Sequence, residues 1–133
     1  MTDIVIDASF AVDLVHNQLV AVPEALVTAA IWVPVHFEIE CAAALTNLVR
    51  RGVHDLDTAH ARLGEIRSLD YEVERDLDLL MPGALRLAAA NITLYDALYV
   101  VLATERLTHL WTTDRRLATA GPSVVVDRIP EGT

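Results

Sequence analysis

Short apolar runs rich in β-branched residues alternate with longer segments of helical periodicity, and this alternation constrains the fold more than any other feature of the sequence. Strands that are joined by helices pair in parallel, and helices then cover both faces of the sheet. The strands are expected at residues 3–6, 31–33, 71–73, 110–112 and 124–126. The sequence therefore predicts one α/β domain over residues 1–133, a three-layer α/β/α sandwich around a mainly parallel sheet of four or five strands.

Apolar stripes and helix-end signals predict the helices. The expected ranges are 10–16, 18–29, 35–51, 55–69, 76–91, 94–106 and 114–119. Ser9 is expected to cap the first helix, and Pro82 to kink or restart the helix predicted over 76–91. Leu56 and Ile66 are expected on the buried stripe of the segment 55–69. The end of the chain, from Pro130, is expected to be a frayed tail.

The composition excludes several kinds of chemistry. All ten basic residues are arginine, so a Walker P-loop, a Schiff-base lysine and a phospho-acceptor receiver domain are excluded. A single cysteine, Cys41, cannot form an internal disulfide and fits the reducing conditions of the cytoplasm. No apolar stretch approaches the ~18 residues of a membrane span, and no secretory signal is visible. Oxygen ligands remain plentiful, with 19 Asp and Glu residues and a net charge of −9.

Two acids follow two predicted strands. Asp7 comes directly after the strand 3–6, and Asp114 follows the strand 110–112. Ligands of open α/β sheets bind at the carboxyl ends of the strands, and parallel strands place those ends at one edge. Both carboxylates are therefore expected to face one crevice. The alternative is that each simply caps the helix that follows it.

Two further acids lie on predicted helices. Asp96 interrupts an apolar segment, and a buried charge needs an ion partner or a metal; alternatively, it completes a capping box with Thr93. Glu40 borders the core stripe of the helix 35–51, where it is either a site residue or a solvated rim glutamate. Glu38 is a rival on the same helix, and periodicity alone does not choose between the two glutamates.

Four segments together resemble a known family. They are Ile6-Asp7-Ala8-Ser9, the run from Glu40 to Leu45, Tyr95-Asp96-Ala97-Leu98-Tyr99, and the run from Thr112 to Leu117. In this order they resemble the PIN-domain family, and more closely the VapC-type ribonuclease toxins of type II toxin–antitoxin systems. The family glutamate precedes small residues and a leucine five positions later, which favours Glu40 over Glu38. The resemblance implies an endoribonuclease that hydrolyses RNA phosphodiesters with Mg²⁺ or Mn²⁺.

The resemblance also implies roles for individual residues. Oxygen-only ligands select hard divalent ions, and a metal-bound water can act as the nucleophile near neutral pH. Asp7, Asp96 and Asp114 are expected to hold the ion, and Glu40 either to hold it through water or to orient the nucleophile. Some relatives carry another acid shortly after the last aspartate, where this chain has arginine, so the inferred site has three or four acids.

Four other residues are expected to support these acids or the substrate. The hydroxyl groups can orient the carboxylates and the guanidinium groups can contact a phosphate, unless they are ordinary cap, strand-end and surface residues. These residues are Ser9, Thr112, Arg115 and Arg116.

The excess of acidic residues limits the kinds of molecule that the protein is expected to bind. Nucleic-acid binders usually present a basic face, so a net charge of −9 disfavours non-specific duplex binding and favours short single-stranded or loop RNA. An acidic surface suits a basic protein segment, and the family resemblance implies a cognate antitoxin and a homodimer. Two other classes stay open: a non-catalytic binding or assembly module of the same fold, and a metal-dependent phosphatase for small molecules.

Overall fold

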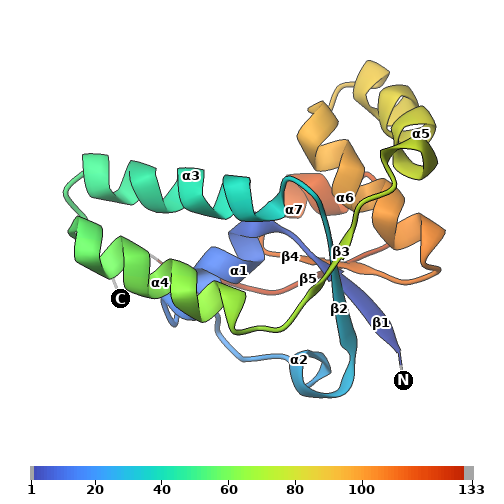
Figure 1. The fold of residues 1–133 in the computed structure, drawn as a ribbon. Helices are drawn as coiled ribbons and strands as arrows, with labels where there is room; N and C mark the ends of the chain where they lie inside the picture. Colours follow the sequence, from blue (N-terminus) through green and yellow to red (C-terminus); the bar gives the residue numbers. More distant parts are fainter. Residues whose placement is uncertain (1, 131–133) are drawn as a thin grey trace.

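The computed structural model describes residues 2–130 and has a five-stranded sheet at its centre (Figure 1). The strands pair in the order β3-β2-β1-β4-β5, and every neighbouring pair is parallel. Their bounds are β1 Asp3–Ile6, β2 Ala30–Pro34, β3 Glu72–Glu74, β4 Leu110–Thr112 and β5 Ser123–Val125. The predicted α/β class, the number of strands and their parallel direction are confirmed.

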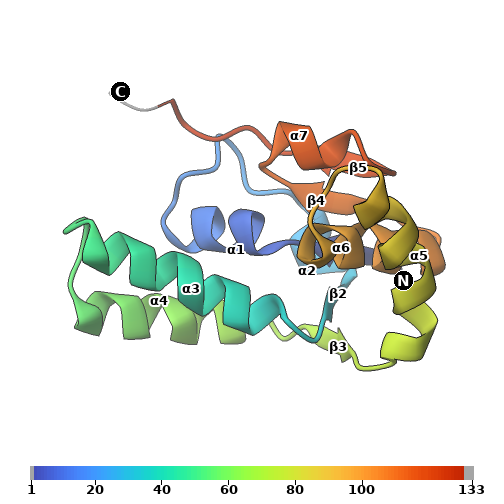
Figure 2. The same cartoon turned by 90° about the horizontal axis from the view of Figure 1, so that it is seen from above.

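Helices cover both faces of the sheet (Figures 1 and 2). On one face lies α6 (Leu94–Glu105), with α5 (Leu77–Ala89) packed on its outer side. On the other face lies α1 (Ala8–Val15), against which α3 (Phe37–Arg50) and α4 (Leu56–Arg67) pack as a long hairpin. Two short helices complete the chain, α2 (Ala25–Thr28) and α7 (Arg115–Ala118). The three-layer prediction is confirmed.

The helix α6 is the most deeply buried of the helices. Every residue from Ala97 to Ala103 is buried, because α6 packs on β1 and β2 from inside and is covered by α5 from outside. The apolar sequence Leu94–Ala103 predicts such burial on all sides. Its amino end, with Thr93 as the cap, lies at the edge of the sheet where the parallel strands end.

One predicted helix is wrong. The sequence predicts a helix over 18–29, but only Ala25–Thr28 is helical. Asn17 adopts a left-handed backbone conformation with φ of 55°, which stops α1. The next residues do not form a helix, and Leu19 pairs with Arg128 across an antiparallel bridge. Pairing with a distant segment has replaced the local helical preference here.

Three smaller expectations are also corrected. Asp7, not Ser9, caps α1, since its side chain accepts the amide hydrogen of Phe10. Leu56 is 62% exposed at the start of α4, although Ile66 is buried as predicted. The helix α5 continues through Pro82 without a restart. The predicted frayed tail lies almost entirely in residues 131–133, outside the described residues. Within residues 2–130, no helix has both the length and the apolar character to cross a membrane.

Candidate active site at the carboxyl edge of the sheet

Asp7 is the most buried acid of the candidate site, with only 4% of its surface exposed. It follows β1 and caps α1, so its carboxylate is fixed by backbone as well as side chains. One oxygen, Oδ1, accepts hydrogen bonds from the Phe10 amide and the Ser9 hydroxyl, both at 2.9 Å. The other, Oδ2, accepts the hydroxyl of Thr112. Burial nevertheless raises the pKa of Asp7 to about 6, and the nearby Asp114 adds to the rise.

Thr112 connects Asp7 to Asp114. Its side chain is fully buried at the end of β4, where its hydroxyl donates to Asp7 and accepts the amide hydrogen of Asp114 at 2.9 Å. Asp114 in turn caps α7 through Oδ1, which accepts the amides of Arg116 and Leu117. Its second oxygen has no bond within residues 2–130. The neighbouring strands β1 and β4 thus present one buried and one exposed carboxylate at the same edge.

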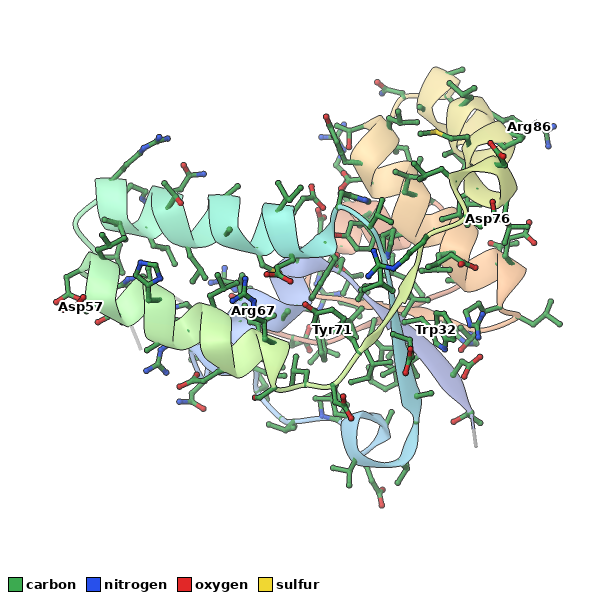
Figure 3. All side chains as sticks on the ribbon, viewed as in Figure 1. Trp32, Asp57, Arg67, Tyr71, Asp76 and Arg86 are labelled. Carbon is green, nitrogen blue, oxygen red and sulfur yellow. The ribbon has the colours of Figure 1, made fainter. Side chains whose placement is uncertain are left out.

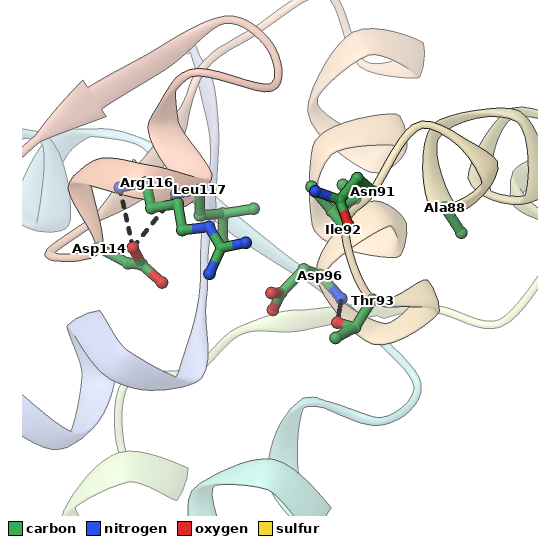
Figure 4. Close-up of a pocket in the computed structure, with 8 residues that line it drawn as sticks. All are labelled: Ala88, Asn91, Ile92, Thr93, Asp96, Asp114, Arg116 and Leu117. Carbon is green, nitrogen blue, oxygen red and sulfur yellow. Dashed lines mark hydrogen bonds between the residues drawn. The ribbon is translucent and has the colours of Figure 1, made fainter.

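Asp96 and Asp114 line one cleft of about 370 Å³ (Figure 4). Asp96 lies in the first turn of α6, where its amide donates to the cap residue Thr93 at 3.0 Å. Its carboxylate points toward the α7 side of the cleft, from which Asp114 and Arg116 project. Partial burial raises the pKa of Asp96, and the charges of Glu40 and Asp114 raise it further.

Glu40 and Glu38 have separate environments although both are in the first turn of α3. The Glu40 carboxylate contacts α6, where it accepts the Tyr99 hydroxyl at 2.7 Å. Glu38 instead accepts bonds from Arg67 of α4 and from the Tyr71 hydroxyl, both labelled on the α4–β3 side in Figure 3. Glu40, not Glu38, therefore has the electrostatic contact with Asp96.

Each of the four carboxylates is repelled by the charge of at least one of the others. Asp7 is affected by the charge of Asp114, and Asp96 by the charges of both Asp114 and Glu40. They do not form a closed ligand set: within residues 2–130, no three Asp, Glu, His or Cys side chains are close enough together to hold one metal ion. The donor type does fit a hard divalent cation, since all four groups are carboxylates and two have raised pKa values that a cation would counteract. A shared ion would require the acids to approach one another.

The two arginines after Asp114 lie in different environments. Arg115 forms an ion pair with Asp127 outside the cleft. Arg116 lines the cleft together with Asp96 and Asp114, and it has no ion pair within the described part of the chain (Figure 4). Arg116 is thus the basic side chain that can meet an anion at the acids.

Two residues of this site were not assigned a role from the sequence. His36, at the amino end of α3, places Nε2 3.3 Å from Oε1 of Glu40, and Tyr99 donates to the same oxygen. A signal for Tyr99 was present, because a tyrosine in an all-apolar buried helix needs a partner for its hydroxyl. Nothing local in the sequence indicates His36, which meets Glu40 only because α3 and α6 are adjacent in the fold.

Comparisons with known proteins show what the whole chain is similar to. Ribonuclease VapC3 of Mycobacterium tuberculosis, from strain CDC 1551 / Oshkosh and from strain ATCC 25618 / H37Rv, is 37% identical over 123 residues, covering 90% of this chain and 88% of the relative. Among solved structures, PAE2754 from Pyrobaculum aerophilum superposes with a TM-score of 0.70 and 22% identity, over 92% of this chain and 83% of that chain. No family model matches the sequence.

Proposed function

Because this chain belongs to the VapC-type branch of the PIN-domain ribonucleases, we propose that it is a metal-dependent endoribonuclease and the toxin of a toxin–antitoxin pair. The observation that carries the proposal is the cleft between α6 and α7, where Asp96 and Asp114 face one space with Arg116, which has no ion pair within residues 2–130. Acids and a single guanidinium in one cleft match the two needs of phosphodiester hydrolysis: ligands for a cation and a contact for the phosphate.

Asp7, Asp96 and Asp114 are the proposed ligands of Mg²⁺ or Mn²⁺, with Glu40 either a further ligand through water or the group that orients the nucleophile. A divalent ion of this kind would supply an activated water and stabilise the charge that grows on the phosphate. The protein's part is to orient the carboxylates, and the cation would favour their ionised form. Ser9 and Thr112 support that orientation, since their hydroxyl groups donate to the two oxygens of Asp7.

Arg116 is the proposed contact for the substrate phosphate. Its guanidinium lines the acidic cleft and has no carboxylate partner among residues 2–130, whereas Arg115 is occupied by Asp127. A guanidinium group matches the geometry of a phosphate with two parallel hydrogen bonds. One such group beside a cation would supply positive charge inside an acidic cleft.

The partners proposed from the sequence follow from the same charge distribution. Single-stranded or loop RNA is the proposed substrate class, because a cleft lined by one arginine among the described residues cannot neutralise many phosphates of a duplex. A cognate antitoxin with a basic segment is the proposed protein partner. We also propose a homodimer that acts in the cytoplasm; Cys41 is a buried free thiol, as that compartment allows.

The test is cleavage of a single-stranded RNA pool in Mg²⁺ or Mn²⁺, with EDTA as the blank. Asp96→Asn is expected to lower the cleavage rate by at least about a hundredfold, because it removes a charge that the cation and the reaction both use. The matched control is Asp55→Asn, since Asp55 caps α4 far from the cleft by accepting the Thr58 amide. Equal rates for the wild type, Asp96→Asn and Asp55→Asn would contradict the proposal.

The other two classes predict different outcomes. A non-catalytic module would neither cleave RNA nor gain thermal stability from millimolar Mn²⁺, whereas a cation site gains stability by mass action. A small-molecule phosphatase would hydrolyse phosphomonoesters and leave RNA intact.

A further inference from the structure

The hydrogen bonds around Glu40 link the amino ends of two helices. The Tyr99 hydroxyl of α6 donates to Oε1 of Glu40 at 2.7 Å. His36 places Nε2 2.9 Å from the backbone carbonyl of Tyr95 and 3.3 Å from the same Oε1. A carbonyl oxygen only accepts, so the proton of His36 is on Nε2 and is shared between the two acceptors. Glu40 is therefore tied to the first two turns of α6, directly by Tyr99 and through His36 by the Tyr95 carbonyl.

This arrangement cannot easily be exchanged for water. Tyr99 is 1% exposed and His36 is also buried, and their rings pack with centroids 4.8 Å apart. A buried hydroxyl that loses its acceptor pays the desolvation penalty of an unsatisfied donor. Within residues 2–130, Glu40 is the hydrogen-bond acceptor of Tyr99. The buried Tyr99 of α6 consequently fixes the carboxylate of Glu40, which a flexible glutamate side chain alone would leave mobile.

The residues that bind Glu40 also place it near Asp96. Tyr99 lies three residues after Asp96 on α6, and His36 lies four residues before Glu40 on α3, each about one helical turn away. The two carboxylates repel each other. Although burial acts to raise the pKa of Glu40, the bonds from His36 and Tyr99 outweigh it and keep that pKa below its usual value. The contacts from His36 and Tyr99 thus hold Glu40 near a second carboxylate.

We propose that His36 and Tyr99 are positioning residues, which hold the Glu40 carboxylate against the first two turns of α6 so that Glu40 is in place when a divalent cation brings Asp96 and Glu40 together. This inference rests on the proposed function, since it assigns the cation to the same site. It goes further in naming two residues, neither of them a metal ligand, that determine how strongly the cation is bound.

The chain contains its own control for this idea. Tyr71 also donates its hydroxyl to a glutamate of α3, at 3.1 Å, but that glutamate is Glu38, which is paired with Arg67 away from the cleft. Tyr71→Phe and Tyr99→Phe therefore delete the same atom from the same kind of bond. Only the second bond involves a proposed site acid.

The experiment measures the Mn²⁺ concentration that gives half-maximal RNA cleavage, and separately Mn²⁺ binding by calorimetry without RNA. Tyr99→Phe is expected to raise both midpoints by about tenfold, as the loss of one hydrogen bond to a charged group allows. The cleavage rate at saturating Mn²⁺ should return to within a few-fold of wild type, because no reacting group is removed. Tyr71→Phe should leave both midpoints unchanged.

A second pair of variants covers the case in which Tyr99→Phe fails to fold. His36→Gln keeps an N–H donor near the Nε2 position and should retain the wild-type midpoint, whereas His36→Ala should raise it. Equal Mn²⁺ midpoints for wild type, Tyr99→Phe and Tyr71→Phe, or for the two His36 variants, would overturn the proposal. If the wild type binds Mn²⁺ but does not cleave RNA, only the proposed function fails, and the binding midpoints still decide the positioning role. No Mn²⁺ binding by the wild type would overturn both.

Discussion

Asp7 should make the metal-free protein less stable at neutral pH than it is in acid. Burial raises the pKa of its carboxyl from the ordinary 3.8 to about 6 in the folded chain. When the pKa of a group is higher in the folded chain than in the unfolded chain, the group stabilises the folded state fully at a pH below its unfolded pKa. That stabilisation is lost as the pH rises through the folded pKa. The loss amounts to about 1.4 kcal/mol for each pH unit of that window, or about 3 kcal/mol by pH 7.

Asp7→Asn removes the ionisation and keeps the cap, because asparagine caps helices as well as aspartate does. The amide oxygen can accept from Phe10 and Ser9 as Oδ1 does, and the Thr112 hydroxyl can rotate to accept from the amide nitrogen. In EDTA at pH 7.5, we expect the variant to exceed the wild type in free energy of unfolding by up to about 3 kcal/mol. The difference should fall to near zero by pH 4.

The assay is urea unfolding in EDTA at half-unit steps from pH 4 to pH 8. The control is Asp55→Asn, in an exposed cap where the Thr58 amide holds the pKa of Asp55 below its usual value, so that variant should instead lose stability toward neutral pH. Adding Mn²⁺ should reverse the order for Asp7, because the cation stabilises only the ionised wild type. A stability difference between wild type and Asp7→Asn that is constant from pH 4 to pH 8 would refute the reasoning.

Two further predictions concern the cleft and the core. Arg116→Ala should raise the KM for RNA about tenfold or more through the loss of a phosphate contact, while Arg115→Ala, which only breaks an exposed ion pair, should leave it unchanged in the same steady-state assay. Gly121→Ala should lower the free energy of unfolding by about 1–3 kcal/mol, because the added Cβ would lie 2.5 Å from a methyl carbon of the buried, stiff Val100. Gly64→Ala, in a helix with open space around it, should be neutral or stabilising in the same urea titration.

The sheet and the central helix could be predicted because their signals are local. β1, β2 and β4 are short apolar runs that end at a polar residue or at a proline, and these patterns fixed their limits to within a residue or two. The segment Leu94–Ala103 is apolar on all sides, which predicts a buried helix without any knowledge of its neighbours.

The segment before β2 could not be predicted in the same way. Its residues are compatible with a helix, but Val20 donates its amide hydrogen to Asp127 at 2.9 Å, and Ile129 donates to Gln18 at 2.7 Å. These bonds join positions more than a hundred residues apart. Local propensity is a weak preference that such tertiary pairing overrides.

The candidate site was only partly accessible from the sequence. The placement of Asp7 and Asp114 follows from the parallel sheet alone, since both come after strands that end at one edge. Periodicity could not separate Glu40 from Glu38, because both border the buried stripe of α3; the contacts of each with a different helix separate them. The distances among the four acids are a matter of side-chain geometry, which residue spacing does not contain, and they are too long for a closed ligand set within residues 2–130.

Asp7 and Asp114 are proposed ligands of the cation, and each also follows a strand and caps the helix that comes next. Asparagine and serine serve equally well as caps. A lineage could therefore abandon catalysis by changing one nucleotide in an aspartate codon and still inherit an intact, well-folded protein. Such inactive proteins would superpose on active enzymes as closely as active enzymes superpose on one another. A claim of activity for a protein of this fold therefore has to be checked at the individual aspartate positions.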